Sequence, residues 1–439
     1  MTLTQLASSS PTIYQGSGSV TRISSGQLEL KSLCSRNVSY SSSDRGVGIG
    51  KLVPETSYFS LNATDDQGRV WTSERFLIDK LLIDKRVQGN QVTITAQLYK
   101  ISHTAQALPD ENASLRLQLS EFIGIPFRPG ETDQGEPEIV NYVNLQACGY
   151  EFILRYERDS TLIEVTSNSS DLPAFIETRV CEALQFVVGV SISWFTLELN
   201  QGQQKTTTIQ SPFNINININ SRDKQTIVLS PIRLNSADTN EDVWNLFGKY
   251  VCHILTYSKE EFHPISGWVR RIINARTTIV ETRMLTLSVA IEGLLRIGFY
   301  KKGLMDDEIK TVKIQVLDVL DKVKELGLEK KLNDRITGFL KNIKEKDPVR
   351  PIDKLYKLSK EGWLDEDLIK SWDDIRNTST HGGTIERKEI EKYSILCDQV
   401  NVLFNHLVFL LIGYTGKYTD YRKEGWITGD FNSLIDKSN

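Results

Sequence analysis

The chain has 439 residues, of which 39% are hydrophobic and 25% charged, values typical of a soluble globular protein of two or three domains. Its formal net charge of −4 excludes nucleic-acid binding through an overall positive field, so any RNA contact requires a local basic patch. The 5 cysteines are scattered, odd in number and without a Cys-x-x-Cys pair, which argues against a disulfide framework and a structural zinc site.

We therefore expect a reducing, cytoplasmic location, with no metal and no other cofactor. The segment Met1–Ser10 lacks the basic start and the apolar core of a signal peptide. The longest apolar run, Val402–Ile412, is interrupted by Asn405 and His406 and is too short to cross a membrane. No contact with a membrane is expected.

Residues 1–235 are expected to form a β-rich domain, because short segments in this part alternate apolar and polar side chains. These segments are Val92–Tyr99, Leu115–Leu119, Phe195–Leu199 and Phe213–Asn220. Helical spacing predicts one helix between 175 and 190, and the acidic, glycine-containing segment Gly130–Glu138 predicts a surface loop. With His103 as its one histidine and no nucleophile–base constellation, we interpret this part as a recognition or regulatory domain.

A polar linker, Pro231–Asn240, precedes a change to helical periodicity. Helices are expected at Glu241–Leu255, Pro264–Ile273, Thr277–Phe299, twice within Lys301–Lys346, at Leu355–Lys360, up to Arg376, and at Ile385–Tyr414. The expected fold class is α+β, with the β-rich domain over 1–235 followed by an all-helical domain over 236–439.

The helical part contains the segment Trp372–Gly383, in which an arginine and a histidine lie five residues apart. On one straight helix Arg376 and His381 would diverge by about 140°. The poor helix formers between them and the pair Gly382-Gly383 predict a break, and at a junction of two helices the side chains can converge. A permanently charged guanidinium beside an imidazole that titrates near neutrality suits phosphate chemistry.

The order of helix, Arg376-Asn377, three residues, His381, break and long helix resembles the Arg-Asn-x-x-x-His signature of the HEPN superfamily of RNA-cleaving domains. About the last 200 residues are most similar to the Apea-like branch, which occurs in bacterial anti-phage defence proteins, and the N-terminal half loosely resembles the Apea-like N-terminal domain. The resemblance implies an all-α HEPN-type helical bundle and a metal-independent RNA endonuclease that leaves 2′,3′-cyclic phosphate and 5′-hydroxyl ends. It further implies a homodimer with one shared cleft, a role in abortive infection, and tRNA or other cellular RNA as target.

The resemblance assigns His381 to proton transfer and Arg376 to stabilising charge on the phosphate oxygens. Asn377 either helps hold the phosphate or caps the helix break. Asp373 lies one turn before Arg376, where it can orient the guanidinium, although the family often has Glu or Lys there. Glu292 matches a glutamate in a similar helix of the family, and its alternative role is an ion pair with Arg296.

A local basic patch for RNA is expected from a cluster with few nearby acids: Arg270, Arg271, Arg276 and Arg283. The alternative is that these arginines are solvated helix faces. The segment Ile385–Tyr414 is apolar around most of its circumference, so it must be buried either within the domain or against a second copy of the chain, and we expect a homodimer with a two-fold axis near this helix.

The second hypothesis is a non-catalytic HEPN-type interaction protein. Its helical domain would bind a partner or a nucleotide, and its β-rich domain would sense a phage component. The intact Arg376, Asn377 and His381 favour the nuclease, and an RNA degradation assay separates the two hypotheses.

Overall fold

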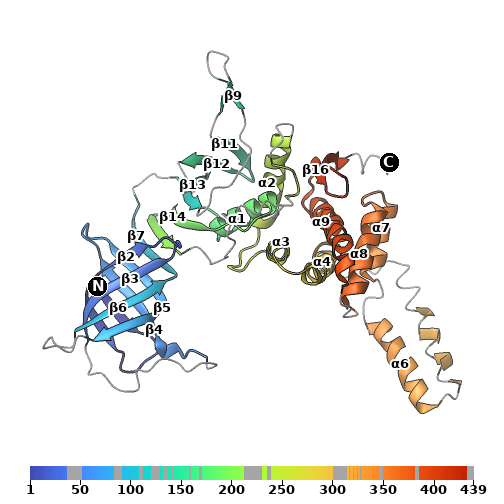
Figure 1. The fold of residues 1–439 in the computed structure, drawn as a ribbon, viewed down its shortest axis with the longest axis horizontal. Helices are drawn as coiled ribbons and strands as arrows, with labels where there is room; N and C mark the ends of the chain where they lie inside the picture. Colours follow the sequence, from blue (N-terminus) through green and yellow to red (C-terminus); the bar gives the residue numbers. More distant parts are fainter. Residues whose placement is uncertain are drawn as a thin grey trace. The chain divides into compact units, whose positions relative to one another are not determined.

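The computed structural model describes residues 1–36, 52–83, 91–107, 112–119, 129–131, 137–139, 142–157, 160–167, 171–211, 230–234, 239–299, 314–315, 317–319, 321–323, 325–326, 329–345, 350–380 and 385–432 (Figure 1). The chain divides into two compact units. The first unit comprises Met1–Lys224 and Tyr250–Phe262, and the second comprises Gln225–Lys249 and His263–Asn439. The division therefore differs from a single cut at residue 235, because it falls within helix α2 (Asn240–Leu255).

The first unit is built on an antiparallel sheet of 13 described strands, and its first six strands close into a barrel. Closure occurs because the long strand β5 pairs with β4 along one edge and with β6 along the other. The barrel strands are β1 (Thr2–Gln5), β2 (Ile13–Arg22), β3 (Leu28–Arg36), β4 (Tyr58–Thr64), β5 (Val70–Ile83) and β6 (Gln91–Leu98), drawn in blue in Figure 1.

In strands such as β3 and β6, alternate side chains point inward and fill the barrel. In β6 the buried positions are Val92, Ile94, Ala96 and Leu98, whereas the residues between them face outward. The alternation in Val92–Tyr99 therefore predicted this strand correctly, although closure also depends on the pairing of β6 with the distant strand β3, which no local pattern encodes.

The sheet continues from β5 beyond the barrel. The further strands, in spatial order, are β7 (Lys100–Gln106), β15 (Gln204–Gln210), β14 (Trp194–Gln201), β8 (Ser114–Leu119), β13 (Ser160–Ser167), β12 (Tyr150–Glu157) and β11 (Tyr142–Ala147). Strands β8 and β14 and helix α1 (Ile176–Val188) confirm three of the sequence predictions. The expected loop Gly130–Glu138 instead contributes to a paired hairpin of β9 (Pro129–Glu131) and β10 (Pro137–Ile139). The predicted strand Phe213–Asn220 lies outside the described residues.

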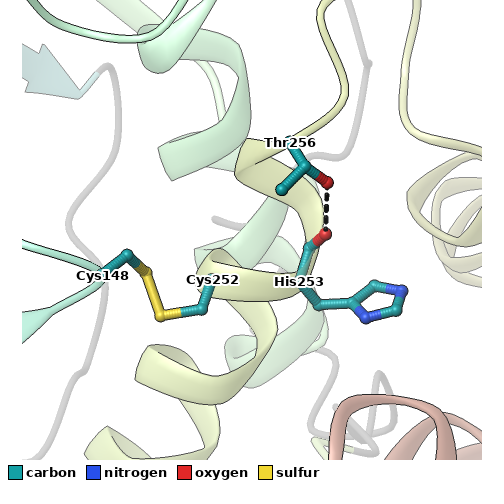
Figure 2. The surroundings of a disulfide bond; sticks show 4 residues. All are labelled: Cys148, Cys252, His253 and Thr256. Carbon is teal, nitrogen blue, oxygen red and sulfur yellow. Dashed lines mark hydrogen bonds between the residues drawn. A yellow bond between two sulfur atoms is a disulfide. The ribbon is translucent and has the colours of Figure 1, made fainter.

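A disulfide bond joins Cys148, in the turn between β11 and β12, to Cys252 on α2 (Figure 2). The two cysteines are 104 residues apart in sequence. The expectation that the scattered cysteines would not pair is wrong for these two, because spacing along the chain does not reveal which distant elements the fold brings together. Cys34, Cys181 and Cys397 are free thiols.

A buried ion pair adds a second tether within the first unit. On α1, Arg179 Nη1 lies 2.5 Å from Glu182 Oε1, and both side chains are fully buried. Arg179 also donates to the carbonyl oxygens of Tyr257 (3.2 Å), Glu261 (3.1 Å) and Lys259. The guanidinium therefore holds the segment after α2 against α1, which explains why Tyr250–Phe262 belongs to this unit.

The second unit contains helices and ends in a short hairpin. Its helices include α3 (Pro264–Ala275), α4 (Val280–Leu294) with the π-helical turn Leu295–Phe299, α6 (Lys330–Glu345), α7 (Pro351–Lys360), α8 (Glu366–Thr380) and α9 (Ile390–Ile412). Helix α4 packs against α3, α8 and α9, and α8 packs against α7 and α9.

Strands β16 (Lys417–Asp420) and β17 (Ile427–Asp430) pair antiparallel after α9. The prediction of an all-α HEPN-type helical bundle is therefore wrong, and the barrel in the first unit was not foreseen. At the coarse level of fold class the chain is α+β, with a β-sheet unit and a mainly helical unit. Four-residue strands are too short to produce an alternation signal that can be recognised in the sequence.

The hairpin covers the apolar surface of α9. The ring of Phe431 lies 5.4 Å from that of Phe409, and the ring of Tyr418 lies 4.5 Å from that of His406. The side chains that were expected to need a second copy, Val402, Phe404, Val408, Phe409 and Ile412, are all buried within the unit. The argument from α9 for a dimer therefore fails. By length and composition the segment Arg387–Ile412 is one candidate membrane span among the described residues, but 67% of its most apolar window is buried, as in a core helix.

Acidification is expected to destabilise the second unit through His406, which is fully buried among the aromatic rings. Burial lowers the pKa of His406 to about 3, from about 6.5 in an unfolded chain. Between these values the unfolded state binds a proton that the folded state does not, so the free energy of unfolding falls as pH falls, by up to about 1.4 kcal/mol per pH unit. Denaturant unfolding of His406→Leu between pH 7 and pH 4 should show a shallower pH dependence. Equal slopes for the two proteins would contradict this account.

Candidate functional site

The candidate site is built around an ion pair between α8 and α4. Arg376 Nε donates to Glu292 Oε1 at 2.8 Å, and the two side chains are 36% and 27% exposed. The guanidinium carbon lies 5.5 Å from the ring centre of Trp372, which is buried one turn earlier on α8. A carboxylate on one side and an indole ring on the other fix the direction of the guanidinium while part of it stays accessible to solvent.

The structure therefore brings together Arg376 and Glu292, which are 84 residues apart in sequence. It corrects the alternative pairing of Glu292 with Arg296. The regular helix ends at Leu294, so Arg296 belongs to the π-helical turn and is exposed there.

Helix α8 was expected to end at Arg376, but it continues to Thr380. Three hydroxyl contacts accompany this last turn: Thr378 Oγ1 donates to the Asp374 carbonyl oxygen (3.0 Å), Ser379 Oγ donates to the Arg376 carbonyl oxygen (3.1 Å), and Thr378 Oγ1 lies 3.3 Å from the Tyr393 hydroxyl on α9. These hydrogen bonds satisfy the hydroxyl groups of Thr378 and Ser379, which would otherwise compete with the backbone hydrogen bonds and favour a break in the helix.

Asn377 is exposed inside α8, so the alternative that it caps a helix break at this point is wrong. Asp373 is half-buried, and its negative charge contributes to the raised pKa of Arg350, whose main cause is the hydrogen bond with Asp353. His381 lies outside the described residues. The structure thus describes three residues of the candidate site, Arg376, Asn377 and Glu292. The fourth, His381, is known from the sequence alone.

The four arginines of the predicted basic patch do not all face solvent. Arg271 is exposed, with its guanidinium carbon 4.5 Å from the ring centre of Trp268. Arg283 instead points inward, where its Nη2 lies 2.9 Å from Asp398 Oδ1 on α9. Arg270 and Arg276 are both half-buried, and Arg276 lines a small pocket together with Arg283. Of these four arginines Arg271 alone is exposed, so the structure supports only part of the predicted basic patch.

A second ion-pair cluster positions the start of α8. Arg422, just after β16, donates from Nε and Nη2 to the two carboxylate oxygens of Asp420, both at 2.8 Å, and also pairs with Asp365. Asp365 in turn accepts the backbone N–H of Asp367 in the first turn of α8, at 2.9 Å. The hairpin thereby fixes the helix that carries Arg376. Sequence reasoning missed this cluster because its members lie on separate elements.

No protein-family model matches the chain, and no curated protein and no solved structure matches it significantly. Among the described residues, no group of three or more His, Cys, Asp or Glu side chains is arranged to hold a metal ion.

Proposed function

We propose that the chain is a metal-independent RNA endonuclease in which Arg376, Asn377 and His381 act on one phosphodiester. The observation that carries the proposal is the anchored but accessible guanidinium of Arg376, held through Nε by Glu292 and 36% exposed at the C-terminal end of α8. A guanidinium whose position is fixed before the substrate arrives stabilises developing charge without a reorganisation cost. The resemblance of the motif to HEPN ribonucleases supports the same assignment.

In the proposed reaction the 2′-oxygen of one nucleotide attacks the adjacent phosphorus, and His381 accepts the hydroxyl proton. The bond from phosphorus to the 5′-oxygen breaks, and that oxygen takes a proton from the protonated His381 of the second copy in the proposed homodimer. Arg376 stabilises the negative charge on the non-bridging oxygens, and Asn377 donates to the phosphate. The products are a 2′,3′-cyclic phosphate and a 5′-hydroxyl, and all atoms come from the RNA itself. The motifs of the two copies together supply the base, the acid and the charge-stabilising groups that this step requires.

The proposal includes a cytoplasmic homodimer that acts in anti-phage defence on tRNA or other cellular RNA, with the first unit sensing a phage-derived trigger. Two exposed apolar side chains on α4, Leu285 (50%) and Val289 (43%), support self-association. At helical spacing they share a face with Glu292, so a second copy bound there would lie beside the first Arg376.

The experiment that tests the proposed function is incubation of the purified protein with end-labelled RNA, with and without EDTA. Cleavage is expected at equal rates in both conditions. An activity that disappears on chelation and returns with Mg²⁺ would point to another kind of site. Saturable RNA binding with no cleavage in either condition would instead favour a non-catalytic sensor.

A further inference from the structure

Helix α3 carries an arginine stacked on a tryptophan at the surface of the second unit. The guanidinium carbon of Arg271 lies 4.5 Å over the ring centre of Trp268, three residues earlier on the same helix. Trp268 is half-buried, whereas Arg271 is exposed and forms no ion pair with any residue that the structure describes. The indole ring thus supports one side of a guanidinium plane whose charge no described carboxylate neutralises.

The indole ring is held in place by α4, where Gly293 leaves room for it. A Cβ atom at Gly293 would lie 2.5 Å from both Nε1 and Cε2 of Trp268, so any other residue would displace the ring. Glycine within a helix destabilises it by about 0.5–1 kcal/mol relative to alanine. The close approach of the indole is the physical reason for glycine at this position, and it fixes the plane on which Arg271 rests.

The stack lies beside the ion pair of the candidate site. Gly293 directly follows Glu292, whose Oε1 accepts the hydrogen bond from Arg376 Nε at 2.8 Å. Adjacent residues of a helix project about 100° apart, so Trp268 on α3 and Arg376 on α8 contact neighbouring faces of α4 at the same level. An RNA strand with one phosphate at Arg376 therefore has a neighbouring base within reach of the stack.

We propose that Trp268 and Arg271 form the subsite for one unpaired base of the RNA, an inference that rests on the proposed nuclease function. The base stacks on the exposed face of the Arg271 guanidinium, whose charge also attracts the flanking phosphate. Proteins bind single-stranded RNA through arginine and aromatic planes of this kind, whereas the bases of a duplex are covered by their neighbours. The substrate class is therefore single-stranded RNA or an unpaired loop.

The test measures binding and not cleavage, by fluorescence anisotropy of a labelled single-stranded RNA in the His381→Ala background. Arg271→Gln should weaken binding about 5- to 150-fold, the usual effect of removing one stacking side chain. Arg271→Lys should weaken it nearly as much, because lysine keeps the charge but lacks the plane. Trp268→Ala should cost at least about fivefold, since the guanidinium loses its support, and Trp268→Phe should recover most of this because a ring remains.

The matched controls are one variant and one ligand. Arg296→Gln removes an exposed positive charge three residues after Gly293 and should weaken binding by less than about twofold. A duplex RNA of the same sequence offers no free base, so the Arg271 and Trp268 variants should change its binding far less than that of the single strand. Thermal unfolding verifies that each variant is folded, and the exposed Arg271→Lys is expected to be as stable as its parent.

Wild-type-like affinity of Arg271→Lys for single-stranded RNA would overturn the stacking subsite, because charge alone would then explain the contact. Equal weakening of single-strand and duplex binding by Arg271→Gln would overturn it for the same reason. If wild type cleaves RNA while neither Arg271→Gln nor Trp268→Ala weakens single-strand binding, the subsite fails and the nuclease stands. Selective single-strand binding with no cleavage by wild type would refute the nuclease and support the subsite.

Discussion

Replacing Arg376 with alanine is expected to lower the RNA cleavage rate roughly 100- to 1,000-fold while the protein stays folded. This is the usual cost of removing one donor that stabilises charge in the transition state. Arg376→Lys should recover little of the rate, because an ammonium cannot reproduce the planar fork that contacts two phosphate oxygens. Glu292→Gln should give a smaller loss, since the amide still accepts a hydrogen bond from Arg376 Nε but does not match its charge. Single-turnover cleavage of labelled RNA measures all three effects.

The matched control for this series is Arg296→Ala. Arg296 lies four residues after Glu292 and is exposed, but it does not pair with that carboxylate. Its removal should leave the cleavage rate within about twofold of wild type, as expected for a surface charge. If Arg296→Ala and Arg376→Ala reduced cleavage equally, the loss would reflect weaker electrostatic attraction of RNA and not a specific site.

Loss of the bond between Cys148 and Cys252 is expected to destabilise the first unit by roughly 4–5 kcal/mol. The reason is that the bond closes a loop across a sequence separation of 104 residues, and its removal restores the conformational entropy of the unfolded chain. Cys148→Ser and Cys252→Ser should each lower the denaturant midpoint by the same amount. The double variant should show no further loss, because each single change already removes the whole cross-link.

Dithiothreitol provides the internal control for the cysteine series. The reductant should bring wild type to the stability of the variants and should leave the variants unchanged. A wild-type protein isolated from the cytoplasm with both thiols free, and with the same stability as Cys148→Ser, would show that the bond does not form in that compartment.

Local patterns predicted many of the individual elements. The alternation in Leu115–Leu119 and the helical spacing in Pro264–Ile273 correspond to β8 and α3, because each pattern reports which face of a single element is buried. The same patterns do not report long-range pairing. The pairing of β3 with β6 that completes the barrel and the bond between Cys148 and Cys252 join segments that are distant in sequence, and both were missed.

The candidate site shows the same limit. The sequence identified Arg376 and Glu292 individually, but it offered Arg296 as the partner of Glu292, because residues four apart on a helix are neighbours. The actual partner comes from another helix, 84 residues away. The polar details of a site depend on tertiary packing and not on local sequence.

The most direct test of the central proposal is the identity of the RNA ends produced in EDTA by wild type and by His381→Ala. We predict that wild type leaves 2′,3′-cyclic phosphate and 5′-hydroxyl ends, because the attacking group is the 2′-oxygen of the RNA itself. His381→Ala should lower the rate by about 10²–10⁴, as expected for loss of a proton-transfer group. Products that carry a 5′-phosphate and a 3′-hydroxyl, or undiminished cleavage by His381→Ala, would contradict the proposed reaction.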